Sequence, residues 1–338
     1  MQVARTYSVW ATVMWTRRYI FFLLIISTTY TALHELAGLY WLKIPWLPIS
    51  VIGVAVAFFV GFKNNSSYGR LWEARMIWGA IVNASRSWGI LVKDFITNEF
   101  AEAKLSPEEL KEIHKDMIYR HLAWLTSLRY QMRTPRSWEH NNYEGAKSHL
   151  YYKVNELDKP IEEELTHFLS DGDIKEFLSK QNPATQIIAK QSEKLKDLKL
   201  KGLIEDFRHM EMENLLKEFY TQQGKSERIK NFPFPRQYAT FNLISVWIFA
   251  FLLPLGMIST FEEMGSGFVW MSIPFSTLVG WIFFVMEEIG DYSENPFEAG
   301  VNDVPITSLS RTIEIDLREM LGETDLPSKI EPTNNILT

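Results

Sequence analysis

Residues 53–62 read Gly53-Val54-Ala55-Val56-Ala57-Phe58-Phe59-Val60-Gly61-Phe62. Residues four apart lie on one face of an α-helix, so Val54, Phe58 and Phe62 form a row of large apolar side chains. Gly53, Ala57 and Gly61 form a row of small residues beside it, and small residues at this spacing let membrane helices approach closely. Several copies of such a helix around an axis would make a hydrophobic constriction. The same spacing also fits side chains that face lipid or the interior of one chain.

Four apolar stretches are long enough to cross a membrane. They are residues 19–42, 46–62, 238–258 and 268–286, and a spanning helix needs ~20 apolar residues, with a range of about 17–25. The mean hydropathy of the whole chain is only -0.10, because a long polar middle segment offsets these stretches. The sequence therefore predicts an all-α membrane protein with four transmembrane helices.

The chain turns abruptly polar after Phe62 but keeps a helical pattern. Asn64 and Asn65 open this junction, and Arg70, Glu73 and Arg75 follow. Residues three apart on a helix can form an ion pair, so Arg70 and Glu73 favour a structural network that ties helices together. A role for Arg70 in attracting anions below the constriction is the alternative. The second span is expected to continue out of the membrane as one long helix.

Three sequence blocks together resemble the signature of the bestrophin family of ion channels. The first is Asn64-Asn65 followed by Arg70-Leu71-Trp72-Glu73-Ala74-Arg75; the second covers residues 228–238 and the third residues 294–316. They occur in the order of the family, and the resemblance covers roughly residues 5–325. It implies a bestrophin-like homopentamer with one axial pore, whose neck would be formed by Val54, Phe58 and Phe62. A ring is also needed physically, because one helix cannot enclose a pathway.

The resemblance implies a second narrowing of the pore. In bestrophins the cytoplasmic cavity ends in an aperture on the helix that precedes the block at residues 228–238. Aligning this chain through Thr221 and Pro235 without a gap places Phe207 at the aperture. Residues 204–211 are the fallback, because a slip in helix register would move the position by one or more residues.

Eukaryotic bestrophins carry a calcium clasp after the fourth span, and this chain keeps only part of that pattern. Asn295-Pro296-Phe297 is present, but Glu298 and Asp303 are the only acids in residues 298–303. Calcium takes six to eight oxygen ligands, several of them carboxylates. We therefore expect no cofactor and no tight calcium site. Asp303 is expected to cap a helix that begins near Pro305.

The expected organisation has four parts. Residues 1–97 hold the first two spans and the extension of the second, residues 98–235 form a helical cytoplasmic domain, residues 236–290 hold the last two spans, and residues 291–338 form a cytoplasmic helix and tail.

Within the middle part, Ser106-Pro107-Glu108-Glu109 is a capping box that predicts a helix ending at Thr134-Pro135. A loop at about 135–152, a helical pattern at 156–170 and another from Pro183 to a stop at Gly224 follow. Residues 305–321 read as a final helix ended by Gly322.

Lysine and arginine residues set the expected orientation. Arg5, Arg17 and Arg18 precede the first span, and further basic residues follow the second span and precede the third. One short loop between paired spans has only Lys43, and the other has Glu262 and Glu263. Since positive charge collects on the cytoplasmic side, both termini and the middle part are predicted to be cytoplasmic in a multi-pass protein of the inner (plasma) membrane. His34 and Glu35 are expected at the membrane interface, in contact with water. An intramembrane functional pair formed by His34 and Glu35 is the less favoured alternative.

The sequence does not support an enzyme or a nucleic-acid-binding protein. It has no cysteine, and its basic residues are dispersed among acids. His34-Glu35 begins a zinc-protease pattern, but position 38 is Gly38; His114 and His121 lack a third ligand. No metal site is expected. The expected partners are further copies of the chain, inorganic ions and membrane lipid.

The expected function is passive conduction of monovalent ions, with anions such as chloride as the first choice. Aromatic ring edges of Phe58 and Phe62 carry partial positive charge that an anion could meet. Two alternatives remain open. The acids Glu262 and Glu263 near the outer mouth would favour a cation-conducting member of the same family. The chain could also be a membrane-anchored interaction protein that conducts nothing.

Overall fold

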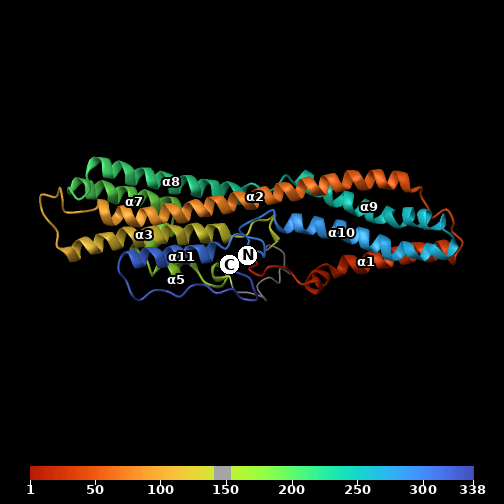
Figure 1. Cartoon of the computed structure of the whole chain (residues 1–338). Coiled ribbons are helices and arrows are strands. Elements are labelled where there is room, and N and C mark those ends of the chain that lie inside the picture. The colour runs from red at the N-terminus through yellow and green to blue at the C-terminus, as the bar shows by residue number, and fades with distance from the viewer. Residues whose placement is uncertain (141–153) are drawn as a thin grey trace. The chain divides into compact units, whose positions relative to one another are not determined.

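The chain is helical throughout the residues that the structure describes. A computed structural model describes residues 1–140 and 154–338, and Figure 1 shows their helices as coiled ribbons. Within these two ranges there is no strand; the only extended pairing is two isolated bridges, Gln2 with Ile336 and Thr333 with Ile336. The all-α fold class predicted from the sequence is confirmed. The described residues divide into two compact units.

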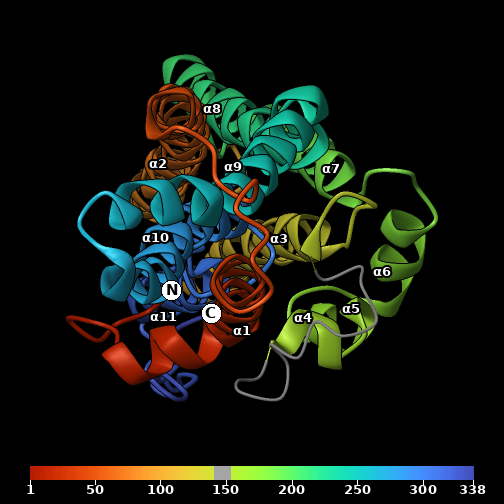
Figure 2. The same ribbon diagram turned by 90° about the vertical axis from the view of Figure 1, so that its right-hand side faces the viewer.

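The first of these, which we call the membrane unit, comprises residues 4–70 and 233–294. Its helices are α1 (Val9–Glu35), the first part of α2 (Trp46–Phe95), α9 (Arg236–Glu262), the 3-10 helix η3 (Ser266–Met271) and α10 (Ser272–Tyr292). α10 packs against both α1 and α9 (Figure 2). Four helices are long and apolar enough to cross a membrane. Leu23, Val246, Leu253 and Phe284 are fully buried between them.

The first span differs from its expected bounds of 19–42. α1 begins at Val9 because the Ser8 side chain accepts a hydrogen bond from the Ala11 N–H and caps the helix. It ends at Glu35, and Gly38 then turns the chain with φ +69°, a conformation that glycine adopts at no steric cost. His34 is only 1% exposed and lies 3.0 Å from Glu35. The expectation that His34 faces water was wrong, because the ring is enclosed by the bundle and by Tyr40, whose centroid is 5.3 Å away.

α2 is one uninterrupted helix of 50 residues. At 1.5 Å per residue it is roughly 75 Å long. That length exceeds the ~30 Å hydrocarbon core of a bilayer by more than twofold, so the helix continues well beyond a membrane span. The polar junction after Phe62 is helical, as the sequence predicted.

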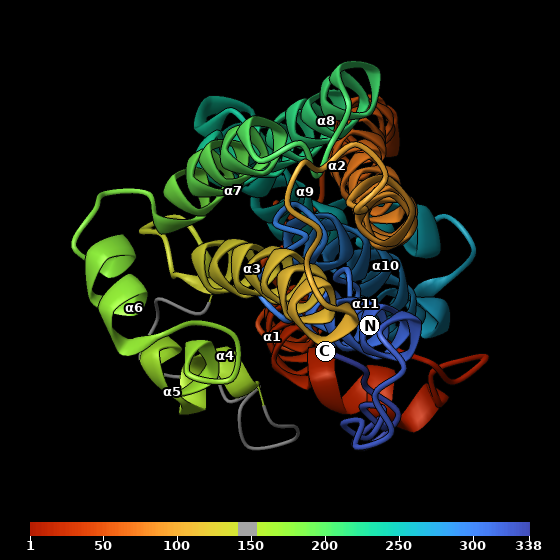
Figure 3. The ribbon, with the colours of Figure 1, turned by 90° about the vertical axis from the view of Figure 1, so that its left-hand side faces the viewer.

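The second compact unit, which we call the polar unit, comprises residues 1–3, 71–232 and 295–338. It contains the rest of α2, α3 (Pro107–Arg133), α4 (Asn155–Asp158), α5 (Ile161–Leu165), α6 (Asp171–Leu178), α7 (Pro183–Leu200), α8 (Asp206–Asn231) and α11 (Ile306–Met320). α7 packs against α3 and α8, while α5 and α11 pack against α3 (Figure 3). The core is rich in aromatic side chains, among them Trp78, Trp88, Trp124 and Phe219.

Local signals placed several helix ends correctly. The Ser106 hydroxyl accepts from the Glu109 N–H and the Glu109 carboxylate accepts from the Ser106 N–H, which completes the predicted capping box at the start of α3. α3 ends before Thr134, as expected. α11 is followed by Gly322 with φ +76°. These features depend on residues within one helical turn, so the sequence alone reveals them.

Two expected helical segments are interrupted in the structure. The segment from Pro183 to Gly224 is split between α7 and α8 by Gly202, which has φ +69°; a Cβ there would lie 2.8 Å from the Phe100 carbonyl oxygen. No stop occurs at Gly224, because α8 runs on to Asn231. The pattern at 156–170 forms the two short helices α4 and α5. The expected loop at 135–152 falls partly on residues 141–153, outside the described residues.

Candidate functional site

The membrane half of α2 has two faces with opposite surroundings. On one face Ile49, Val56 and Val60 are buried and pack with residues of α9, such as Val246 and Phe249. The other face carries Val54 (72% exposed), Phe58 (72%) and Phe62 (47%). These three side chains therefore do not belong to the interior of the chain, which excludes one of the interpretations that their spacing allowed. They face lipid, another subunit or a pathway between subunits.

The row of small residues serves two different contacts. Gly53 is buried, and a Cβ at this position would lie 2.9 Å from the Phe249 ring of α9. Ala57 is exposed, and a Cβ added at Gly61 would meet no atom within 4 Å. Gly53 therefore allows a close contact within the chain, whereas Ala57 and Gly61 leave a flat surface on which a second copy could pack. The close approach of a neighbouring helix that the spacing predicts is present at Gly53, where the neighbour is α9 of the same chain.

One aromatic side chain of α9 lies beside the exposed row. The rings of Phe62 and Tyr238 are 5.9 Å apart between centroids, and Tyr238 is 55% exposed. Phe59, next to Phe58, contacts Phe241 one turn further along α9 with a centroid distance of 5.3 Å. α9 thus supports the Phe62 end of the row with two aromatic contacts and adds a phenol hydroxyl near it.

Beyond Phe62, a buried lysine joins α2 to α10. Lys63 is 2% exposed, and its Nζ lies 2.6 Å from a Glu287 carboxylate oxygen and 3.1 Å from an Asp291 carboxylate oxygen. The Asn242 side chain of α9 also donates to Glu287. This cluster was not predicted from the sequence. The sequence feature that could have revealed it is a lysine and several acids at the ends of apolar stretches, because an unpaired charge is costly there.

The two asparagines of the junction occupy different positions. Asn64 donates to the Val60 carbonyl at 3.0 Å and to the Met286 carbonyl of α10 at 2.9 Å. A Cβ on Gly290 would lie 2.8 Å from the Asn64 side-chain oxygen, so Gly290 lets α10 approach this amide. Asn65 is exposed. Asn64 therefore fixes α2 against α10, while Asn65 remains on the open side of the helix.

Arg70, Glu73 and Arg75 each face a different neighbourhood. Arg70 donates from Nε to the Glu294 carbonyl at 2.7 Å. Glu73 forms an ion pair with Arg228 of α8, and Arg75 is exposed. Glu73 thus ties α2 to α8 within the polar unit.

Phe207 lies in the first turn of α8 and is 79% exposed. The Glu205 side chain caps this turn by accepting from the Phe207 N–H at 3.1 Å and the Arg208 N–H at 3.4 Å. Within the fallback range 204–211, Ile204 is 3% exposed and belongs to the core of the polar unit. Ile204 is therefore no candidate for lining a pathway, whereas Phe207 has the exposure that an aperture residue needs.

The acids that follow Asn295-Pro296-Phe297 are held inside the polar unit. Asp303 is 1% exposed and accepts from the Gly300 N–H at 2.8 Å. Glu298 accepts from the His140 backbone N–H at 3.1 Å. Burial and the nearby Glu298 raise the pKa of Asp303 to about 7, which favours the protonated form over the carboxylate that a calcium ion requires. No group of three metal-ligating side chains occurs in the described part of the chain.

Asp303 does not cap α11, contrary to expectation. The residue before this helix is Pro305, and no side chain caps it. The Asp303 carboxylate instead closes the turn that starts at Gly300, three residues earlier. The preference of aspartate for caps and for such turns has the same cause, a short side chain that accepts from a nearby backbone N–H, so sequence alone did not distinguish them.

A pair of opposite charges lies between the loop that joins α1 to α2 and the end of α9. Lys43, in the loop between α1 and α2, lies 2.7 Å from Glu262 at the end of α9. Glu263 is exposed. One of these two acids is therefore offset by a lysine.

Comparison with known proteins identifies relatives along most of the chain. The family model described as "Bacterial/Fungal Bestrophin protein" matches residues 6–319. The voltage-dependent anion channel-forming protein YneE of Escherichia coli K12 is 27% identical over 292 residues, which cover 86% of this chain and 82% of that protein. A voltage-dependent anion channel-forming protein of Ralstonia nicotianae is 26% identical over 311 residues, covering 91% of this chain and 87% of that protein.

The fold also has solved relatives. The crystal structure of a bacterial bestrophin homologue from Klebsiella pneumoniae superposes with a TM-score of 0.75 at 22% identity, and the match covers 90% of this chain and 98% of that one. Fold, helix order and the matched family model agree over nearly the whole length. The chain belongs to the bacterial and fungal bestrophin family.

Proposed function

We propose that the chain forms a passive ion channel, a homopentamer around one axial pore, that passes monovalent anions such as chloride. The observation that carries this proposal is the exposed row Val54, Phe58 and Phe62 on a helix whose opposite face is buried in its own chain. The bestrophin relatives are named as anion channel-forming proteins, which supports the same activity here. Membership of this family confirms that the chain is not an enzyme.

The neck would control conduction through its wetting. Moving an isolated charge from water into a medium of low dielectric constant costs tens of kcal/mol by Born estimates. An apolar ring therefore conducts only while it is wide enough to hold water, and such rings close by dewetting. The positive edges of the phenylalanine rings favour an anion. The hydroxyl of Tyr238, whose ring lies beside Phe62, would offer an anion a hydrogen-bond donor at the end of the neck.

Two features bear on the alternative of cation conduction. The acids Glu262 and Glu263 at the outer mouth would attract cations, but Lys43 pairs with Glu262 at 2.7 Å and offsets one charge. The remaining acid, Glu263, is exposed to solvent screening. The net charge at this mouth is therefore less negative than the two acids alone suggest, which supports anion conduction over cation conduction.

Both termini and the polar unit would lie in the cytoplasm, with the four spans in the inner membrane. Arginines in or before α1 and before α9 support this orientation. They are Arg5 before α1, Arg17 and Arg18 in the first half of α1, and Arg228 before α9. A protease added from the cytoplasmic side should remove tags from Met1 and Thr338, whereas a tag inserted at Gly265, between α9 and α10, should resist it. Protection of either terminal tag would reverse the proposed orientation.

The deciding experiment is ion flux through the purified protein in liposomes. Under a potassium chloride gradient, the reversal potential should approach the value for chloride, and Phe58→Ala should raise the flux because it widens the neck. A reversal potential near the value for potassium would establish cation conduction. No flux under any gradient or voltage, from particles of the correct size, would favour a membrane-anchored interaction protein.

Two further measurements accompany the flux assay. Native mass spectrometry should give particles of five subunits. Chelation of calcium should leave the flux unchanged, because the proposed channel needs no cofactor. A steep loss of flux on chelation would show that residues 298–303 hold a calcium ion after all.

A further inference from the structure

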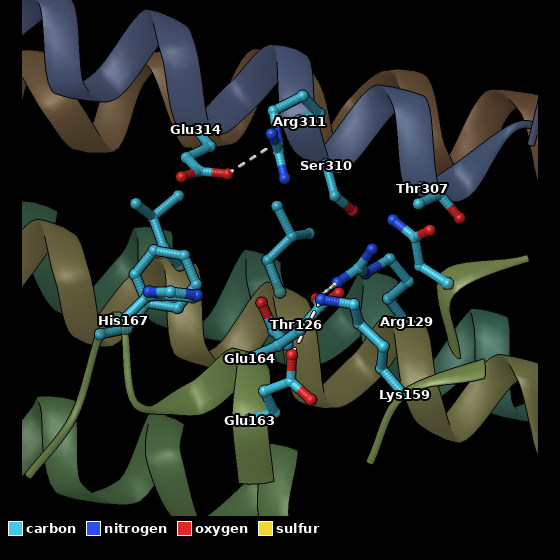
Figure 4. A pocket seen from close by; sticks show the side chains of 14 residues that line it. Thr126, Arg129, Lys159, Glu163, Glu164, His167, Thr307, Ser310, Arg311 and Glu314 are labelled. Carbon is cyan, nitrogen blue, oxygen red and sulfur yellow. Dashed lines mark hydrogen bonds and ion pairs between the residues drawn. The ribbon is translucent and has the colours of Figure 1, made fainter. Parts of the chain in front are cut away.

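A small cavity in the polar unit has no part in the proposed pore. It has a volume of about 150 Å³ and lies between α3, the segment of α4 and α5, and α11. Figure 4 shows its polar lining residues arranged around a few apolar side chains of α3. Arg129 and Thr126 come from α3, Lys159 and Glu163 from the lower wall, and Arg311 and Glu314 from α11.

The charges that line the cavity cancel one another. Three ion pairs surround it: Arg129 with Glu164, Lys159 with Glu163 at 2.8 Å, and Arg311 with Glu314 at 3.0 Å. The dashed lines in Figure 4 mark these pairs. An added cation or an added anion would leave one charge without a counter-charge in this neutral site. A molecule that carries both signs would not.

One of the three pairs is able to exchange partners. The side chains of Lys159 and Glu163 are 51% and 55% exposed. Arg311, by contrast, is 30% exposed, and its partner Glu314 is 13% exposed and has Arg318 as a second partner at 3.3 Å. Exposed ion pairs contribute little stability, so their members can turn toward a ligand at low cost. The Lys159–Glu163 and Arg311–Glu314 pairs lie on opposite walls of the cavity. A ligand carboxylate could therefore meet a cation of one wall while its ammonium group meets an acid of the other.

The third pair forms a fixed polar floor. Arg129 is 6% exposed and is held by Glu164 and by Glu156, whose carboxylate oxygen lies 2.8 Å away. Both terminal nitrogens of the guanidinium are thus already occupied by carboxylates, so Arg129 bounds the cavity without changing partners.

We propose that this cavity binds a small zwitterion with a carboxylate and an ammonium group, namely a free amino acid with a small side chain. The volume corresponds to about five water molecules at roughly 30 Å³ each. Glycine, alanine and serine are of that size, whereas tryptophan is too large. The site is separate from the neck and the aperture.

The proposal is tested by calorimetric titration of the purified full-length protein in detergent. Glycine, alanine and serine should bind saturably, while tryptophan, acetate and methylammonium should not. Acetate and methylammonium carry the two charges of glycine on separate molecules, so they test whether both charges are needed. Saturable binding of acetate or of methylammonium, as tight as that of glycine, would overturn the proposal in favour of a simple ion site.

Variants locate the binding. Arg311→Gln and Glu163→Gln each remove one charge from opposite walls, and each should weaken glycine binding at least tenfold. Thr126→Leu should abolish binding by filling the cavity without changing its charge. Lys190→Gln is the matched control, because Lys190 forms a similar ion pair with Glu193 on α7, away from the cavity. The Lys190→Gln protein should bind glycine as tightly as the wild-type protein does.

The remaining outcomes are decisive as well. Circular dichroism and particle size confirm that each variant is folded, and a variant that fails this check is replaced by the other two. No binding of any small amino acid to the folded wild-type protein would overturn the proposal, as would equal binding in all three cavity variants. The readout is binding and not flux, so its failure is distinguishable from failure of the proposed channel function.

Discussion

Both halves of α2 bury apolar side chains, but only the membrane half also buries a charge. In the membrane half, Phe58 is 72% exposed while Lys63 is 2% exposed. In the polar half, Trp78 and Trp88 are fully buried, while Arg86 is exposed. Val56 and Val60 are buried in the first half as the two tryptophans are in the second, so the difference lies in the buried lysine and in the exposed phenylalanine. The first half has an outer surface made for lipid or for other subunits, and a buried charge that must be paired.

The largest expected effect contrasts an aromatic residue from each half. Trp88 is completely buried among His121, Phe219 and other core residues. Trp88→Ala should cost about 3–5 kcal/mol of folding free energy, because it leaves a cavity. Phe58→Ala should leave the fold of the subunit unchanged, since the ring is exposed. Denaturant or thermal unfolding in detergent measures both; equal losses would show that Phe58 is as buried in the assembly as Trp88 is in the chain.

A buried charge in the membrane half gives the next largest effect. Lys63→Met leaves the Glu287 carboxylate, which is 5% exposed, without its cation. Breaking one partner of a buried pair costs about 3–5 kcal/mol, so the yield of folded protein should fall sharply. Lys43→Met is the control, because the Lys43–Glu262 pair is partly exposed and should change stability by at most about 1 kcal/mol. A stable Lys63→Met protein would mean that water reaches this cluster.

The row of small residues provides a test of which surface of α2 meets another subunit. Gly53→Leu should destabilise the single subunit, because a Cβ added at this position would lie only 2.9 Å from the Phe249 ring. Ala57→Leu should leave the subunit folded but weaken assembly, because Ala57 is exposed in one chain. Native mass spectrometry separates these effects. A complete ring from the Ala57→Leu protein would place the contact between subunits on another face.

Phe207 and Ile204 offer a similar contrast between an exposed and a buried side chain in the polar unit. Phe207→Ala removes a 79% exposed ring and should change relative ion permeability severalfold, with assembly intact. Ile204→Ala, three residues earlier, should lower stability and leave permeability alone, because Ile204 is 3% exposed. Reversal potentials in mixed salts report permeability. If Met210→Ala alters permeability and Phe207→Ala does not, the helix register of the aperture is shifted.

The smallest expected effect is a pH dependence in the polar unit. Burial and Glu298 raise the pKa of Asp303 from 3.8 to about 7. The folded state therefore binds a proton that the unfolded state has released between these values, so stability falls as the pH rises through this window. The loss between about pH 6 and about pH 8 should be about 1 kcal/mol.

Replacing the carboxylate should remove this pH dependence. In Asp303→Asn the unfolding temperature should be flatter over the same range, since an amide oxygen can still accept from the Gly300 N–H. Asp325→Asn, at an exposed position, serves as control. An unchanged slope in the Asp303→Asn protein would assign the titration to another group.

The sequence by itself determined the features that depend on neighbouring residues. The four spans, the continuity of α2 across its polar junction, the capping box at Ser106 and the end of α11 at Gly322 all follow from patterns within a few residues. The row Val54, Phe58 and Phe62 was likewise readable from helical periodicity. These properties are local because a helix repeats every 3.6 residues and its ends are capped within one turn.

The tertiary structure decided what each face meets. Lys63 and its partner Glu287 are 224 residues apart in sequence, and no local pattern connects them. The contact of Gly53 with Phe249, the break at Gly202 against the Phe100 carbonyl, and the burial of His34 and Asp303 depend in the same way on segments brought together by packing. Pairing and burial are set by distant neighbours in space, so the sequence revealed the exposed row as a pattern and only the fold revealed which of its neighbours are buried.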